Sequence, residues 1–311
     1  MIQPLDFYTE EKTILEKKAA TLKSKSAKLS VFRFAVFITT CFLVYLTFGN
    51  YTTVFSIAFS GILLFGFLVI KHVNLQRKRA IIKAKISINN KEIEVLSNNF
   101  YHLETGEEFS DSKQFYSNDI DLFGKGSFFQ YINRTTTNNG KVLLANTLTE
   151  NKTTAILEKQ ITIKELSEKV KWRQHFSALA SLVSVKNTSK SIVKWISNYT
   201  AVFPTFLKTL QIIFSIISLV LIGFISFGII SFSVIIIWFF IGLFITAKFV
   251  KKTNILYAET DKVRETFKQY HVLLNEIESE KFVSKTLKEK QQIITSEAKK
   301  ASVIFKEFAR I

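Results

Sequence analysis

Two long stretches without any charged residue constrain this chain more than any other feature. Residues 34–70 and residues 209–247 contain no Asp, Glu, Lys or Arg, over 37 and 39 positions respectively. A membrane-spanning helix needs about 20 consecutive apolar residues. A single helix of 37 residues would be about 55 Å long, well beyond the thickness of one hydrocarbon core. The sequence therefore predicts two transmembrane helical hairpins, one in each stretch.

Glycine and asparagine mark the expected turn of each hairpin, at Gly49-Asn50-Tyr51 and at Ser226-Phe227-Gly228. Both residue types favour tight turns. The four expected legs are Phe34–Phe48, Thr52–Ile70, Thr209–Ile225 and Ile229–Ala247. The alternative is a pair of buried core helices in a soluble protein. Such helices seldom run 18 or more residues without a charge.

Basic residues at the ends of both stretches predict the orientation in the membrane. Lys and Arg accumulate on the cytosolic side of transmembrane helices. Two hairpins would place every charged segment on that side, so we expect both termini in the cytosol and the protein in the bacterial inner membrane. Neither hairpin contains an ionisable candidate for a proton relay or an ion pathway, which argues against a transporter or a channel. The flanking residues are Lys25, Lys28, Arg33, Lys71, Arg77, Lys78, Arg79, Lys248, Lys251 and Lys252.

The formal net charge of +17 predicts attraction to anionic surfaces. It arises from 42 basic and 25 acidic residues. Such an excess favours lipid head groups, nucleic acid, or both. Lysines beside the spans can serve lipid alone, so composition does not choose between these partners. The candidate contacts for lipid or nucleic-acid phosphate are Arg77, Lys78, Arg79, Lys83, Lys251 and Lys252.

The predicted fold class is all-α, a membrane protein with two transmembrane hairpins and a cytosolic helical core. Five segments are expected: an amphipathic helix at 1–33, a hairpin at 34–70, the core at 71–208, a second hairpin at 209–247, and a long helical segment at 248–311. A basic helix is expected near Gln76–Lys85, and a loop covers about 97–121.

Capping residues predict where the short helices of the core begin. Ser127 and Gln130 have the spacing of a capping box, and Thr137 or Asn138 can cap a second helix. A third helix is expected from Thr154 to Leu182. In the C-terminal segment, apolar residues at heptad spacing predict one continuous helix for a coiled coil or an antiparallel partner. They are Leu256, Val263, Phe267, Tyr270, Leu274 and Ile277, and then Leu287, Ile294, Ala298, Ala301, Phe305 and Phe308.

No residue pattern in the chain indicates catalysis, a cofactor site or a metal site. Cys41 is the only cysteine, and the four histidines (72, 102, 175 and 271) lack metal-ligand spacing. A Walker loop needs Gly, four residues, and then Gly-Lys-Ser/Thr, whereas Gly140-Lys141 is followed by Val142. The acidic residues Glu276, Glu278 and Glu280 are expected on a solvated helix face.

The most specific local sequence lies between residues 119 and 176. It contains Gly126-Ser127-Phe128, Ile132-Asn133-Arg134-Thr135, Thr137, Gly140 and Leu143-Leu144, followed by Ile163, Leu166 and Trp172-Arg173. This stretch resembles the central helical core of the DNA mismatch repair MutS family, and most closely its membrane-anchored members. The resemblance covers roughly 60 residues, and its motif positions imply structural roles for Gly126, Ser127, Asn133, Arg134, Thr135, Thr137, Gly140 and Leu144.

The resemblance implies a helical lever that links DNA contact to ATP hydrolysis, in a homodimer. Two parts of the family pattern are absent: the segment before residue 34 is too short for a mismatch-recognition domain, and no ATPase lobe occurs. The chain is therefore expected to be either a fragment of a longer ATPase or a relative without one, and not an enzyme by itself. ATP and Mg are expected only if such a lobe follows residue 311.

Two other functions remain open from the sequence. The chain can be a membrane scaffold whose cytosolic helices bind a protein partner without any nucleic-acid role. It can also be a tether that binds nucleic acid non-specifically through its basic surface.

Overall fold

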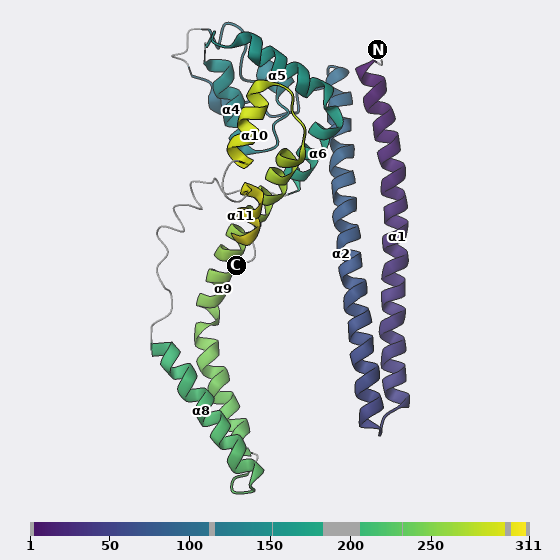
Figure 1. The fold of residues 1–311 in the computed structure, drawn as a ribbon, viewed down its shortest axis with the longest axis vertical. Helices are drawn as coiled ribbons and strands as arrows, with labels where there is room; N and C mark the ends of the chain where they lie inside the picture. Colours follow the sequence, from purple (N-terminus) through teal and green to yellow (C-terminus); the bar gives the residue numbers. More distant parts are fainter. Residues whose placement is uncertain are drawn as a thin grey trace. The chain divides into compact units, whose positions relative to one another are not determined.

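A computed structural model describes residues 3–111, 116–150, 152–182, 206–231, 233–295 and 300–308. Within these ranges every regular element is a helix, which confirms the all-α prediction (Figure 1). The chain forms two compact units. The first contains residues 1–184 and 272–302, and the second contains residues 185–271 and 303–311.

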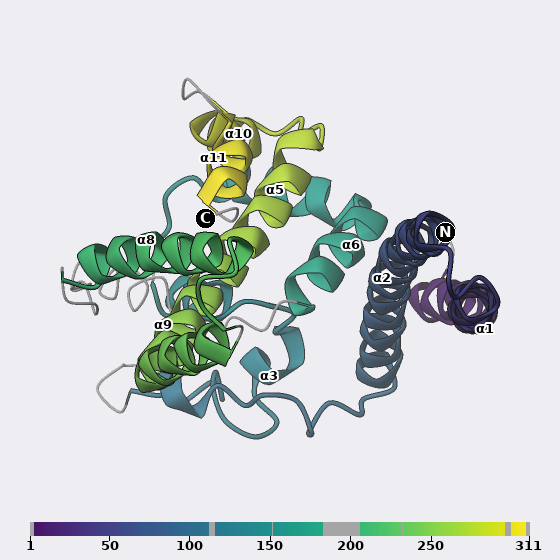
Figure 2. The same ribbon diagram turned by 90° about the horizontal axis from the view of Figure 1, so that it is seen from below.

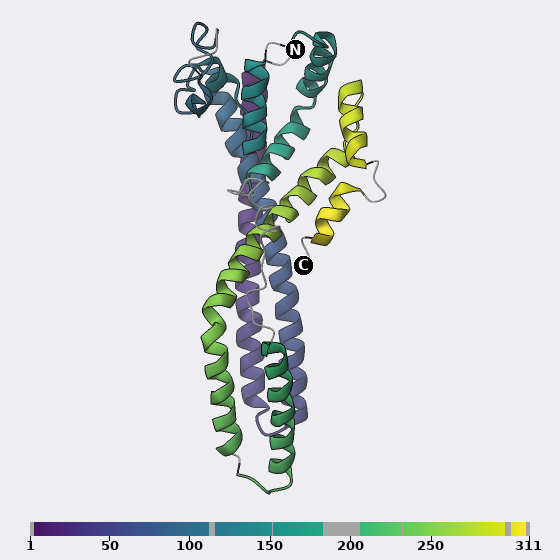
Figure 3. The same ribbon diagram turned by 90° about the vertical axis from the view of Figure 1, so that its left-hand side faces the viewer.

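The first unit is built on a long antiparallel pair of helices, α1 (Pro4–Leu46) and α2 (Tyr51–Leu96), which lie side by side (Figures 1 and 3). The turn lies where the sequence predicts it, and the Asn50 side chain caps α2 by accepting a 3.3 Å hydrogen bond from the Thr53 amide. Neither helix breaks where its apolar part ends. The separate helices expected at 1–33 and near 76–85 are therefore parts of α1 and α2, because no Pro or Gly interrupts the sequence there.

Short elements follow α2: η1 (Glu107–Phe109), α3 (Phe128–Ile132), α4 (Asn138–Thr149), α5 (Ile156–Glu168) and α6 (Val170–Ser181). The single helix expected from Thr154 to Leu182 is wrong, because the helix breaks at Lys169, which has φ −89° and ψ 45°. The two halves have different partners. α5 contacts α10, whereas α6 contacts α2, and Figure 2 shows α2 between α1 and α6.

The second unit contains a second apolar hairpin. It consists of α8 (Phe206–Ser226) and the first part of α9 (Ser233–Ser279), with Gly228 in the intervening turn at a positive φ of 71°. α11 (Ala301–Phe308) packs on α9 through aromatic rings. The Phe267 ring lies 5.7 Å from that of Phe305 and 5.3 Å from that of Phe308. These contacts join the two halves of the predicted heptad stripe.

The stripe does not form one continuous helix, so the prediction for residues 248–311 is wrong in this respect. α9 ends at Ser279, α10 spans Lys285–Thr295, and α11 follows as a separate helix. The residues between α9 and α10 bond instead to the side chains of Glu165 in α5 and of Lys169 at the break after it.

Candidate functional site: membrane hairpins and a helical junction

Three described helices are long and apolar enough to cross a membrane: α1, α2 and α9. α8 contains a shorter apolar stretch, Thr209–Ile225. Many apolar side chains of these helices are exposed, which would be unfavourable in water. Phe34 is 67% exposed and Phe244 is 78% exposed. Contiguous apolar surface of this kind is typical of a surface that meets lipid.

Cations lie at the ends of both apolar legs of the first hairpin, on the side opposite its turn. The Arg33 guanidinium lies 5.8 Å from the centre of the Phe65 ring on the opposite leg. The Lys71 ammonium lies 5.5 Å from the centre of the Phe67 ring. Both apolar legs therefore end at the same level. Small residues bring the legs together, since a Cβ on Gly61 would lie 2.4 Å from the Thr40 methyl group.

The second hairpin is held by an aromatic pair and one polar contact. The rings of Phe214 and Trp238 stack with centroids 4.4 Å apart. The Trp238 indole N–H donates a 2.9 Å hydrogen bond to the Ser218 hydroxyl, which satisfies the one polar atom of that ring. Gly242 faces Phe214, and a Cβ there would lie 2.7 Å from the ring.

The candidate phosphate-contacting residues lie on two different helices. α2 carries Arg77, Lys78, Arg79 and Lys83, and α9 carries Lys251 and Lys252. All are exposed except Arg79, which is half-buried. Within the described parts of the chain, no carboxylate lies within 4 Å of any of these cations. Their charge is therefore available to an external anion, whether lipid or nucleic acid.

The first part of the family-like motif forms a compact cap. Ser127 begins α3 and its hydroxyl accepts a 3.1 Å hydrogen bond from the Gln130 amide, which confirms the predicted N-cap. The Gln130 side chain is fully buried, and its amide group forms hydrogen bonds to backbone groups outside α3. It accepts from the Gly126 amide at 2.7 Å and donates to the Leu103 carbonyl at 2.6 Å. Gly126 permits this approach because its φ is +81°.

The next motif residues form a tight turn that is tied to α2. The Asn133 side-chain oxygen accepts hydrogen bonds from the amide and the hydroxyl of Thr135, at 3.0 and 2.6 Å. The Arg134 guanidinium pairs with Glu92 of α2 at 2.8 Å. It also donates to the Tyr131 carbonyl at 2.8 Å. The motif is therefore fixed to the same helix that carries one apolar leg of the first hairpin.

The last motif residues begin α4. Of the two candidate caps, Thr137 is the N-cap, and its hydroxyl accepts a 3.1 Å hydrogen bond from the Gly140 amide. Leu144 is half-buried. Lys141, the residue that prompted the Walker comparison, is paired with Glu108 at 2.7 Å and Glu104 at 3.2 Å. The bond to Glu108 raises the pKa of Lys141.

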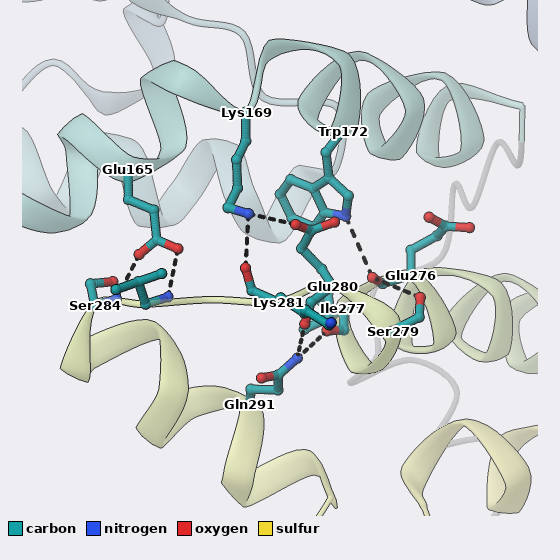
Figure 4. A network of polar contacts seen from close by, with 11 residues as sticks. Glu165, Lys169, Trp172, Glu276, Ile277, Ser279, Glu280, Lys281, Ser284 and Gln291 are labelled. Atoms are coloured by element: carbon teal, nitrogen blue, oxygen red, sulfur yellow. Dashed lines mark hydrogen bonds and ion pairs between the residues drawn. The ribbon is translucent and has the colours of Figure 1, made fainter.

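A polar junction between α5, α6 and the α9–α10 connection was not predicted (Figure 4). Both carboxylate oxygens of Glu165 accept 2.7 Å hydrogen bonds, from the amides of Val283 and Ser284. Lys169 donates to the Glu280 carboxylate at 2.6 Å and to the Lys281 carbonyl at 2.8 Å. The break between α5 and α6 and the break between α9 and α10 are therefore hydrogen-bonded to each other.

Glu276 and Glu278 of α9, and Glu280 directly after it, are not a solvated helix face, which corrects the expectation from their spacing. Glu280 pairs with Lys169, and its side chain is 24% exposed. Glu278 accepts bonds from the amide and hydroxyl of Ser302, at 2.9 and 2.6 Å. Glu276 lies 3.6 Å from His175. Burial and the nearby Lys85 lower the pKa of His175, and Glu276 opposes them only in part.

A buried amide pair joins α2 to α6. The Gln174 side chain donates a 3.0 Å hydrogen bond to the Asn89 side-chain oxygen, and Asn89 donates to the Lys85 carbonyl at 2.7 Å. Next to it, an apolar cluster is formed by Leu179, Ala180 and Leu273. No group of His, Cys, Asp and Glu able to hold a metal occurs among the described residues.

Comparison with known proteins adds no relative to this description. No protein family, no characterised protein and no solved structure matches the chain.

Proposed function

We propose that the chain is a membrane-anchored relative of the MutS helical core, which serves as the lever part of a DNA-repair-type ATPase. The observation that supports this most is the Arg134–Glu92 pair at 2.8 Å. It fixes the MutS-like motif to α2, and α2 continues unbroken into a membrane leg. A displacement of the core is thereby passed along one rigid helix rather than across a hinge.

The proposed topology has four membrane spans with both termini in the cytosol of a bacterial inner membrane. The apolar stretch of α8 would supply the fourth span by tilting little or by local thinning of the bilayer. Cysteine labelling from outside, in a background with Cys41 replaced, tests the topology. We expect reagent access at positions 50 and 228 and protection at positions 12 and 300. Labelling of position 12 or 300 in intact cells contradicts it.

The proposed partner is DNA, bound weakly and without preference for mismatches, by a chain that forms a homodimer. Phosphate attraction alone gives dissociation constants of about 10⁻⁴ to 10⁻⁶ M at physiological salt. ATP and Mg are expected only if an ATPase lobe follows residue 311. By itself the chain is proposed to have no ATPase activity, because the Walker spacing is absent from it.

The decisive experiment measures DNA binding by the chain in neutral-lipid nanodiscs across 50–200 mM salt. The test variant combines Arg77→Gln, Lys78→Gln and Lys83→Gln, and the matched control combines Lys285→Gln, Lys288→Gln and Lys290→Gln on α10. We expect the logarithm of affinity to fall with the logarithm of salt. The test variant should lower that slope by about one for each DNA phosphate that it no longer neutralises. The control should behave as the unmodified chain.

The other outcomes favour different functions. No DNA binding at 50 mM salt, together with binding to anionic vesicles, favours the membrane scaffold. A tight preference for mismatched duplex that resists salt would indicate a mismatch sensor and refute the proposed weak, non-specific contact.

A further inference from the structure

We propose that a pocket between α1, α2 and α6 binds a small phosphate-bearing anion. The pocket lies wholly within the first unit and has a volume of about 250 Å³. The side chains that matter for recognition are Tyr8, Lys91, Glu92, Arg134, Arg173 and Ser177. The inference does not depend on a relation to MutS.

The pocket carries more positive charge than its own carboxylate neutralises. Glu92 is paired with Arg134 at 2.8 Å. Among the described residues, no carboxylate lies within 4 Å of Lys91 or Arg173, so these two cations line one cavity without an acidic partner. Guanidinium and ammonium groups at such a site favour phosphate, which accepts several charge-assisted hydrogen bonds at once.

Hydroxyl groups complete the lining and can donate to the same anion. They belong to Tyr8, Ser87, Thr136 and Ser177. Burial raises the pKa of Tyr8, and the negative charge of Glu92 adds to this effect, against the opposing charges of Arg173 and Arg134. The phenol therefore remains protonated at neutral pH and available as a donor.

The size of the pocket favours a small ligand. Pockets for drug-sized molecules and cofactors usually measure about 300–1,000 Å³, so 250 Å³ suits inorganic phosphate or a small phosphate monoester rather than a whole nucleotide.

A lipid head group is too far away to be the ligand. Ala84 is the pocket residue of α2 nearest the apolar leg, and it lies 13 residues beyond Lys71. At a rise of 1.5 Å per residue the separation is about 20 Å, and a tilt of 40° would still leave about 15 Å. The head-group layer on one side of a bilayer is only about 5–8 Å thick. The anion should therefore come from solution.

The test is calorimetric titration of the full chain, in phosphatidylcholine nanodiscs, with inorganic phosphate and then glycerol 3-phosphate at constant ionic strength. Arg173→Gln and Lys91→Gln should each weaken binding by about tenfold, the effect of losing one bond to a charged group. Lys171→Gln, which removes an exposed cation of α6 outside the pocket lining, should leave binding unchanged. Circular dichroism of each variant checks that the helices are retained.

The proposal is overturned if neither anion binds at 10 mM, or if Lys171→Gln weakens binding as much as Arg173→Gln. It is also overturned if binding occurs only with nanodiscs that contain phosphatidic acid, because the site would then be a lipid surface. Binding only to an oligonucleotide, with no response to the small anions, overturns it as well. DNA binding that fails while phosphate binding persists would refute the proposed function alone.

Discussion

Removing the carboxylate of Glu165 should loosen α10 without unfolding the apolar hairpins. The two oxygens accept 2.7 Å bonds from the amides of Val283 and Ser284, directly before α10 begins at Lys285. A hydrogen bond to a charged group contributes about 1.5–3 kcal/mol, and an anion at a helix N-terminus about 0.3–1 kcal/mol. Because the side chain is only half-buried, we take the low end, about 1.5 kcal/mol for Glu165→Ala.

Hydrogen–deuterium exchange of the α10 peptide measures this loss directly. A loss of about 1.5 kcal/mol in local opening free energy accelerates exchange by about tenfold. Glu168→Ala is the matched control, since Glu168 is an exposed acid of the same helix, and it should leave α10 unchanged. Equal exchange in the two variants, or no acceleration in Glu165→Ala, would refute the reasoning.

The same carboxylate predicts a dependence on pH. Burial acts to raise the pKa of Glu165, but bonds from Ser284 and Val283 and the charge of Lys169 outweigh it, so the pKa lies below its usual value. A carboxyl group whose pKa is lowered in the folded state contributes its full stabilisation of the fold at pH values above its pKa in the unfolded chain, about 4.3. The protection of α10 should fall as pH drops below that value, and Glu165→Gln should remove this part of the decline.

Three further substitutions test the packing of the core and the anchor. Gln130→Leu should lower the free energy of unfolding by about 2–4 kcal/mol in chemical denaturation, because it leaves buried backbone groups without partners. Gln130→Glu should cost at least as much, because it sets a buried carboxylate oxygen against the Tyr101 and Leu103 carbonyls. Gly106→Ala should lower the thermal midpoint, since its φ is +72° and a Cβ would lie 2.5 Å from the Phe129 ring; an unchanged midpoint contradicts this. Gly61→Ile should separate the legs of the first hairpin at Thr40, measured as faster exchange there, whereas Gly66→Ile, in open space, should not.

The features that could be predicted from the sequence depend on neighbours along the chain. A charge-free stretch, Asn50 at a turn, and a hydroxyl at Ser127 or Thr137 three residues before the amide it caps are local signals. In the structure, a helix or a turn lies at each position where one of these signals predicts it. The number of spans and their orientation stay predictions.

The junction could not be predicted in the same way because its partners are far apart in the sequence. Glu165 and Ser284 are separated by 119 residues, and Lys169 and Glu280 by 111. One local signal for the break was available. Continued from Ile277, the heptad stripe would place Lys281 and Ser284 at apolar positions, and it resumes at Leu287 one residue out of phase. A polar interruption with a phase shift indicates two helices rather than one.

The way the first unit is held together indicates where it can move. Its described apolar core is small, with Leu179, Ala180 and Leu273 as one cluster, whereas polar bonds join α5 and α6 to the α9–α10 connection. Polar bonds at half-buried positions contribute less to stability than a packed core, so the junction should open at lower free energy than the α1–α2 pair.

α2, with 46 residues, is about 69 Å long, and only about 30 Å of it is needed to cross the hydrocarbon core. The remaining half is a rigid arm to which Arg134 and Gln174 attach the core. Opening at the junction would therefore release α10 while the arm, the motif at residues 126–144 and the apolar legs stay connected.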